Sequence, residues 1–220
     1  MTGPILIGPH MRAGACAAIA TGPLTLDGAP WGTWLPGTLL HPGSWPEGTP
    51  RVLAFTGSLS GTPDQGDLRN WMPAGIQACR GALASAHARA AERSQRLVIV
   101  PHALHIISDL HSTLRLLREH PDLGVAIAPA ALLTESMLDH AADHLARILG
   151  TLGPVADAII LHDLVRSVDE QGEPAVTACD WGRGVLDTKL VESLMPRGVL
   201  DAPLVESLVP GGIPTLILGA

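Results

Sequence analysis

The sequence of 220 residues has no tyrosine, one phenylalanine and a single lysine, Lys189. Lys and Arg number 14 against 21 Asp and Glu, which gives a formal net charge of -7. A nucleic-acid-binding protein needs a concentrated basic surface, so this balance argues against that class. Charged residues make up only 16% of the chain and hydrophobic residues 46%. This composition excludes disorder for most of the chain and predicts one globular domain over 1–220.

Cysteines and long apolar runs are also few. The three cysteines, Cys16, Cys79 and Cys179, form no CxxC pair, so neither a disulfide framework nor a zinc ribbon is expected. No apolar run reaches the roughly 18 residues of a transmembrane helix, and the N-terminal residues lack the pattern of a signal peptide. We therefore expect a cytoplasmic protein with no membrane partner. The excess of Arg over Lys, with 24 Gly and 19 Pro, is typical of a GC-rich bacterial genome.

Apolar runs alternate with helical patterns from residue 51 onward. Strands are predicted at 51–55, 97–100, 123–128, 158–162 and 216–218, and helices at 67–93, 109–120 and 134–149. Asp109 and Thr134 are the expected N-caps, and Gly150 the expected end of the last helix. Fully apolar strands between helices indicate a parallel α/β sheet. We predict a TIM-type (β/α) barrel, which usually needs about 250 residues and is here short or incomplete in its first units. A doubly wound open sheet is the alternative.

The two ends of the chain differ from this pattern. Residues 1–50 are rich in Gly, Pro and Trp and are expected to be irregular, with short strands at 4–8 and 38–40. Near the C-terminus, GVLDTKLVESLMP at 184–196 is repeated as GVLDAPLVESLVP at 198–210, with ten of thirteen positions identical. Each copy predicts a short helix capped by Asp and stopped by Pro, so 184–210 is interpreted as a tandem duplication with a structural role.

Histidines follow several of the predicted strands. In a parallel barrel, functional groups lie at the carboxyl ends of the strands. His10 and His41 follow the two strands of the first part, His102 and His105 follow 97–100, and His162 follows 158–162. Imidazole can bind a metal or transfer a proton near neutral pH, so this set is a candidate site. Other polar groups close to these positions are Asp163, Arg166 and Arg183.

Four segments follow one another along the chain: RLVIVPH, HPDLGVAIAPAALL, AIILHDL and GRGVLD. In this order they resemble the second half of the barrel in the sugar phosphate isomerase/epimerase family, the xylose isomerase-like TIM barrels. The resemblance covers most of the chain from residue 51 and implies a TIM barrel that acts on a sugar or sugar phosphate. Family members usually hold one divalent metal with four ligands from strands five to eight.

Most of these ligands have no counterpart here. The resemblance places the strand-five glutamate at Val100, the strand-six aspartate at Ala128 and the strand-eight glutamate near 218–219, where no acid stands. The strand-seven histidine corresponds to His162, and a histidine that often contacts substrate falls near Ala131. One imidazole without a carboxylate does not hold a hard divalent ion usefully. No cofactor is therefore expected unless other residues have rebuilt the site.

Three functional hypotheses follow. The first is a divergent barrel without the family's metal that binds a small polar, sugar-like ligand. The second is an active isomerase or epimerase with a rebuilt histidine site for Mn²⁺, Zn²⁺ or Co²⁺, which needs His102, His162 and His10 or His41 to converge. The third is a structural subunit that forms a homo-oligomer to cover exposed strand edges. The candidate catalytic residues are His162, Asp163 and His102, with His162 also the candidate metal ligand. The candidate ligand-binding residues are His10, His41, His105, Arg166 and Arg183.

Overall fold

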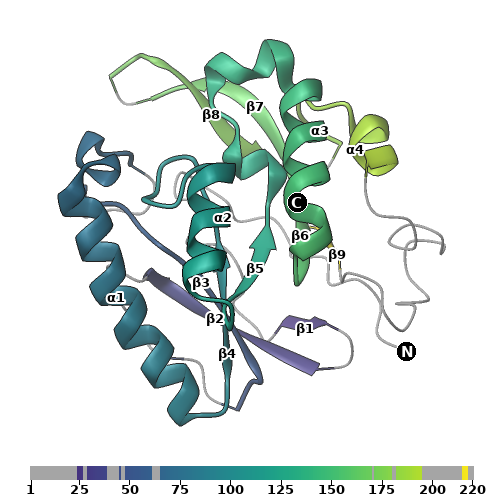
Figure 1. Ribbon diagram of the computed structural model, residues 1–220. Coiled ribbons are helices and arrows are strands. Elements are labelled where there is room, and N and C mark those ends of the chain that lie inside the picture. The colour runs from purple at the N-terminus through teal and green to yellow at the C-terminus, as the bar shows by residue number, and fades with distance from the viewer. Residues whose placement is uncertain are drawn as a thin grey trace.

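A single parallel sheet organises the molecule. The computed structural model describes residues 24–26, 29–38, 45, 48–60, 65–169, 171–179, 182–194 and 215–217. Seven strands follow one another in the order β1-β2-β3-β4-β5-β6-β9 (Figure 1). All neighbours from β2 to β9 are parallel, and β1 pairs antiparallel with β2. The strands are β1 (Leu24–Leu26), β2 (Ala29–Thr38), β3 (Arg51–Phe55), β4 (Arg96–Val100), β5 (Gly124–Ile127), β6 (Ala158–Leu161) and β9 (Thr215–Ile217).

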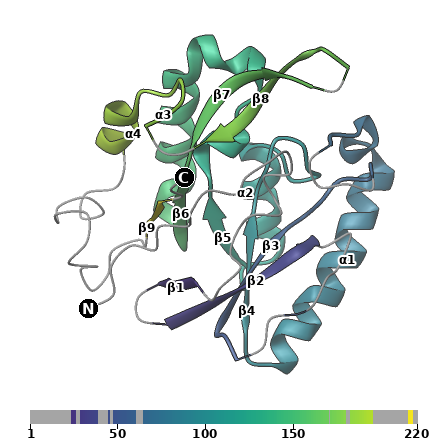
Figure 2. The ribbon, with the colours of Figure 1, turned by 180° about the vertical axis from the view of Figure 1, so that it is seen from behind.

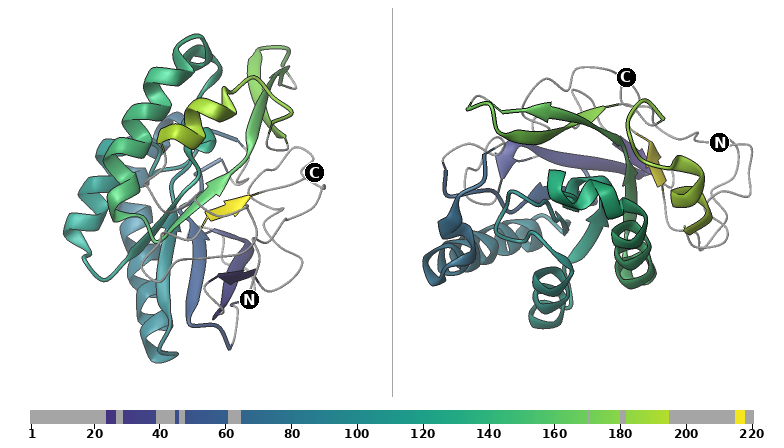
Figure 3. Two further views of the ribbon diagram at one scale, coloured as in Figure 1. Left: turned by 90° about the vertical axis from the view of Figure 1, so that its right-hand side faces the viewer. Right: turned by 90° about the horizontal axis from the view of Figure 1, so that it is seen from above.

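Three helices connect consecutive strands and lie together on one face of the sheet (Figure 3). They are α1 (Pro73–Glu92), α2 (Leu110–Glu119) and α3 (Ala141–Leu152). Figure 2 shows the sheet from the opposite face. A doubly wound sheet reverses its strand order and carries helices on both faces, whereas this order never reverses. The prediction of a partial α/β barrel is therefore confirmed. Among the described strands, β1 and β9 lie at the two edges and do not pair with each other, so this sheet is open.

A hairpin stands above the carboxyl ends of the strands (Figure 1). It consists of β7 (Asp163–Val168) and β8 (Pro174–Cys179), which pair only with each other. The sequence analysis did not predict this hairpin, because its strands are half exposed and lack a long apolar run. The chain then turns into α4 (Thr188–Leu194), in the first copy of the duplicated segment. Asp187 Oδ1 accepts a hydrogen bond from the Leu190 amide at 3.1 Å, so the predicted Asp cap is present.

The central strands are buried on both faces, and the helices cover one of them. All four residues of β5 and of β6 are buried, as are the last four residues of β3 and β4. Side chains from β3 and β4 pack against Leu83 and Cys79 of α1 in one core cluster. Those of β5 and β6 pack against α3 in a second cluster, which includes Leu145 and Leu149. Continuous apolar strands are what a sheet covered on both faces requires.

An ion pair and a buried amide join the strands at their amino ends. Arg96 Nη1 lies 2.6 Å from Asp157 Oδ1, and Asp157 Oδ2 accepts a hydrogen bond from the Val125 amide at 3.0 Å. These contacts tie β4 and β5 to the residue that precedes β6. Nearby, Gln95 Oε1 accepts a hydrogen bond from Trp45 Nε1 at 2.6 Å. This edge of the sheet, which we call the amino edge, therefore has protein partners for each of these polar groups.

Two predicted helices have different boundaries from those expected. The segment 67–93 contains a 3-10 turn, η1 (Leu68–Trp71), and α1 begins only at Pro73. Proline suits the first turn of a helix and does not continue a preceding one, which explains the division. The segment 134–149 likewise divides into a 3-10 turn, η3 (Glu135–His140), and α3. The prediction that Thr134 caps this helix was wrong, because its side chain makes no capping hydrogen bond. The prediction that Gly150 ends the helix was also wrong, because α3 continues past Gly150 to Leu152.

Other expectations concern the ends of the chain. Within residues 1–50, which we expected to be irregular, the ten-residue strand β2 ends at Thr38, so the predicted strand at 38–40 agrees only at its first residue. The predicted strand at 4–8 and the second copy of the duplication lie outside the described residues. Within the described part of the chain, none of the helices combines the length and the apolar character that crossing a membrane requires.

Candidate functional site at the carboxyl edge

The loops that follow β3 and β4 form one bonded unit at the carboxyl edge of the sheet. The Ile106 amide donates to the Gly57 carbonyl at 3.1 Å, and the Ile107 amide donates to Thr56 Oγ1 at 3.2 Å. Thr56 is fully buried, so its hydroxyl is held in place by this contact. The loop after β4 also reaches toward β5, because the Ala103 amide donates to the Ala131 carbonyl at 2.8 Å. The loop that carries two of the candidate histidines is therefore fixed from both sides.

His102 and His105 lie against each other in this loop. Their ring centroids are 4.7 Å apart, and the edge of Phe55 packs against both rings. His105 is fully buried. His102 Nδ1 accepts a hydrogen bond from the Leu104 amide at 3.2 Å. Burial, with the nearby imidazoles of His105 and His162, holds the pKa of His102 well below its usual range, so His102 is uncharged at neutral pH.

His162 joins this cluster from β6. It is the first residue after that strand, and its side chain is only 5% exposed. Burial lowers its pKa to about 4, although the neighbouring Asp163 carboxylate acts in the opposite direction. The Nδ1 atom of His162 is buried, and no atom in the described part of the chain forms a hydrogen bond with it. Buried polar atoms are nearly always paired, so this atom stands out as a group with unused bonding capacity. We call His102, His105 and His162 the histidine cluster.

Asp163 lies beside His162, but its side chain, unlike that of His162, is fully hydrogen-bonded to the backbone. Its carboxylate accepts three backbone hydrogen bonds, from Leu164 at 2.7 Å, Gly184 at 2.9 Å and Leu186 at 3.0 Å. Asp163 is fully buried, and these amides account for both of its oxygens. A side-chain Cβ at position 184 would lie 2.4 Å from Asp163 Oδ1, so glycine is required there. The geometry gives Asp163 a role in joining the two ends of the hairpin, and we leave it out of the proposed site.

The two candidate arginines lie away from the histidine cluster. Arg166 of β7 is exposed and pairs with Glu135 and Asp139 of η3. These ion pairs hold the hairpin to η3. Arg183 is exposed in the turn before α4. His10 and His41 lie outside the described residues, so the structure brings together three of the eight predicted site residues and places two elsewhere, with Asp163 adjacent.

The described residues form no complete site for a divalent metal ion, and His10 and His41, which a rebuilt histidine site would use, lie outside them. Across the described ranges, no group of three or more His, Cys, Asp or Glu side chains is placed to hold one. Val100 and Ala128, at the positions where the resemblance implies carboxylate ligands, are buried apolar residues at the ends of β4 and β5. The neighbours that act electrostatically on His102 are imidazoles rather than carboxylates. No step that uses a metal is therefore derived for this site.

Asn70 is a buried polar residue at the site that the sequence analysis did not identify. It lies in η1, its side chain is fully buried, and it contacts the loops after both β3 and β4. We expected residue 70 to lie inside a long helix, where an asparagine faces solvent by default. The Pro at position 73 was the one signal that could have separated residue 70 from the helix.

Two hollows of the described surface lie away from the histidine cluster. One, of about 30 Å³, lies between α1 and α2 on the helical face, with Cys79, Leu83 and Leu116 among its lining residues. Burial raises the pKa of the Cys79 thiol to about 11, so this thiol is unreactive at neutral pH. Another hollow, at the amino edge, includes Thr49 and Gln95. Neither includes a member of the histidine cluster, so the case for that cluster as a site rests on its chemistry and its position in the fold.

Comparisons with known proteins add structural likeness only. No protein-family model matches the chain, and no curated protein matches it. Among solved structures, a xylose isomerase-like TIM barrel protein from Mycobacterium smegmatis, in complex with magnesium, matches with a TM-score of 0.42 at 11% identity, over 67% of this chain and 51% of that one. A xylose isomerase domain protein from Planctomyces limnophilus matches with a TM-score of 0.43 at 15% identity, over 67% and 48%. The chain thus spans about half the length of these structures, and the fold assignment rests on its own strand order.

Proposed function

We propose that this chain binds a small polar, sugar-like molecule at the carboxyl edge of its parallel strands, through the histidine cluster. The observation that carries the proposal is the buried Nδ1 of His162, which has no hydrogen-bond partner among the described residues and lies at the edge where α/β barrels bind their ligands. An unpartnered buried polar atom costs about 1–3 kcal/mol. A ligand hydroxyl that donates to this atom would offset that cost.

The charge state of the cluster favours a ligand rich in hydroxyl or carbonyl groups. His102 and His162 are neutral near pH 7, because the pKa of each is lowered by burial. A neutral imidazole offers one N–H donor and one nitrogen acceptor, and hydroxyl groups match both. A phosphate or carboxylate would instead need a cation, and the described Arg166 is already paired with two carboxylates.

The same lowered pKa argues against proton-transfer catalysis by His162. A general base works best when its pKa lies near the working pH, and a group with a pKa of about 4 is a weak base at pH 7. Binding is therefore better supported than an isomerase or epimerase reaction, which would need a base beside each of two carbons.

Calorimetric or NMR titration tests the proposal. The probes are D-xylose, D-glucose, sorbitol and glucose 6-phosphate, each with the wild type and His162→Leu. His111→Leu is the matched control, since His111 is exposed on α2 outside the cluster. We expect a free sugar or polyol to bind the wild type and the control, with a loss of about tenfold or more in His162→Leu.

Three results would overturn this function. Binding that His162→Leu leaves unchanged would remove the cluster from the site. Absence of binding by every probe would contradict a sugar-like ligand. Turnover of any probe, abolished in His162→Leu and dependent on added Mn²⁺, Zn²⁺ or Co²⁺, would establish the active isomerase or epimerase instead.

A further inference from the structure

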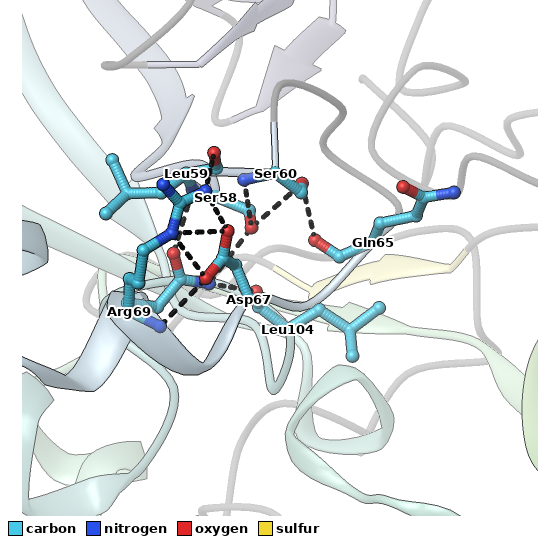
Figure 4. A network of polar contacts seen from close by, with 8 residues as sticks. Ser58, Leu59, Ser60, Gln65, Asp67, Arg69 and Leu104 are labelled. Atoms are coloured by element: carbon cyan, nitrogen blue, oxygen red, sulfur yellow. Dashed lines mark hydrogen bonds and ion pairs between the residues drawn. The ribbon is translucent and has the colours of Figure 1, made fainter.

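The side chain of Asn70 bonds to the loops of two neighbouring strands. Its Oδ1 accepts a hydrogen bond from the Leu59 amide at 2.8 Å, and its Nδ2 donates to Ser58 Oγ at 3.0 Å and to the Leu104 carbonyl at 2.9 Å. Ser58 and Leu59 follow β3, while Leu104 follows β4 (Figure 4). Both donor hydrogens of the buried amide are thus used, together with its oxygen.

Leu104 connects this amide to the histidine cluster. Its carbonyl receives the bond from Asn70, and its own amide donates to His102 Nδ1. An imidazole nitrogen that accepts a hydrogen bond carries no proton. The proton of neutral His102 is therefore on Nε2. The carbonyl and the amide of Leu104 belong to successive peptide units, so His102 offers an N–H donor at Nε2 as long as the Leu104 backbone keeps its conformation.

We propose that Asn70 is a positioning residue for His102: by holding the Leu104 carbonyl, it restrains the backbone torsions of Leu104 and thereby the amide of the preceding peptide unit, which selects the tautomer in which Nε2 is the donor. Asn70 itself does not reach the ring, and no contact between the two is required. The use of that donor for ligand binding rests on the proposed function, whereas the tautomer is a property of the protein alone. The two can therefore be tested separately.

A second buried amide supplies a matched control. Gln95, at the amino edge, also accepts one hydrogen bond and donates two, from Nε2 to the Thr49 carbonyl at 2.7 Å and to Thr49 Oγ1 at 3.3 Å. Gln95→Glu and Asn70→Asp make the same chemical change. Each retains an acceptor oxygen and removes both N–H donors, but only Asn70→Asp breaks the link to Leu104.

The experiment is a long-range ¹H–¹⁵N spectrum of the histidine side chains at pH 7, without ligand, of the wild type and both variants. In the wild type and Gln95→Glu we expect the His102 Nδ1 signal of an unprotonated nitrogen. In Asn70→Asp the Leu104 carbonyl loses its donor and faces a carboxylate, so the signal should shift toward a mixture of tautomers. Ser58→Ala, which keeps the bond from Asn70 to Leu104, should retain the wild-type signal.

The outcomes separate this inference from the proposed function. A protonated Nδ1 in the wild type would overturn the inference even if Asn70→Asp fails to fold. An Asn70→Asp spectrum identical to the wild type would also overturn it. Titration with the same four probes supplies the functional half, where we expect Asn70→Asp to weaken binding about fivefold to tenfold and Gln95→Glu to leave it unchanged. Failure of every probe to bind the wild type would defeat the proposed function and leave the tautomer result intact.

Discussion

The two edges of the parallel sheet differ at one buried polar group, the imidazole of His162. At the amino edge, Gln95 and Asp157 each find partners within the protein, and Arg96 completes an ion pair across neighbouring strands. At the carboxyl edge, His162 is buried with a ring nitrogen that finds no partner within the described ranges. A polar group that is fully satisfied contributes to folding, while an unsatisfied one costs stability unless a ligand completes it. The comparison assigns stability to one edge and binding to the other.

The largest expected effect comes from an exception to this division, Asp163 at the carboxyl edge. Asp163→Ala leaves three amides without an acceptor, and we expect a loss of about 3–5 kcal/mol in the free energy of unfolding. Asp169→Ala is the control, because Asp169 accepts two backbone bonds in the exposed hairpin turn and should cost about 1 kcal/mol or less. Urea denaturation measures both. Equal losses would show that Asp163 does not hold the fold.

The next effect is a dependence of stability on pH. The pKa of His162 falls from 6.5 to about 4 on folding, so between these values the unfolded chain binds a proton that the folded chain does not. Acidification therefore destabilises the protein, by about 3 kcal/mol in total from this residue, and stability stops rising above about pH 6.5. Denaturation of the wild type and His162→Leu from pH 7 down to pH 4 isolates the contribution. A constant difference between the two proteins over this range would contradict the burial of His162.

Loss of the amino-edge ion pair has a smaller effect. Asp157→Asn removes the charge that faces Arg96 while keeping one oxygen for the Val125 amide. Because Arg96 is partly exposed, we expect a loss of about 1–2 kcal/mol by urea denaturation, with probe affinity unchanged. An altered affinity would mean that the two edges are coupled and that the division between them is wrong.

The smallest effect has the opposite sign. His162→Leu removes a buried atom that lacks a partner, so we expect a gain of about 1 kcal/mol at pH 7, accompanied by the loss of probe binding. Thermal denaturation without ligand measures the gain, with His111→Leu as the control. A destabilised His162→Leu would indicate that His162 supports the fold rather than a ligand.

The parallel sheet could be predicted from the sequence because a strand that is buried on both faces is a continuous run of apolar residues. The strands β3, β4, β5 and β6 are continuous apolar runs in the text, and their observed bounds differ from the predicted ones by a residue or less at each end. The predicted N-cap of α2 was confirmed: Asp109 accepts a hydrogen bond from the Ser112 amide at 2.7 Å in a capping box. The hairpin β7–β8 has no continuous apolar run, because half-exposed strands mix polar and apolar residues, and it was therefore not predicted.

The site was only partly predictable, because partners are set by contacts between distant residues. Strand ends identified His102, His105 and His162, since position along a parallel strand fixes the edge at which a residue lies. Asp163 and Arg166 follow the same strand and were grouped with them, yet one binds backbone amides about 20 residues away and the other pairs with η3. Asn70 was missed because its partners come from two loops that are far apart in the sequence.

The carboxylate of Asp163 has a consequence for how this chain can change length. It bonds to Leu164 at the start of β7 and to Gly184 and Leu186 beyond the end of β8, so the two ends of the hairpin segment are held together next to β6. A segment whose two ends are bonded together can become longer or shorter without moving the strands of the sheet. Doubling its length costs only about 0.6 kcal/mol in loop-closure entropy. The hairpin is therefore a replaceable module, and segments of other lengths can be exchanged there above an unchanged histidine cluster.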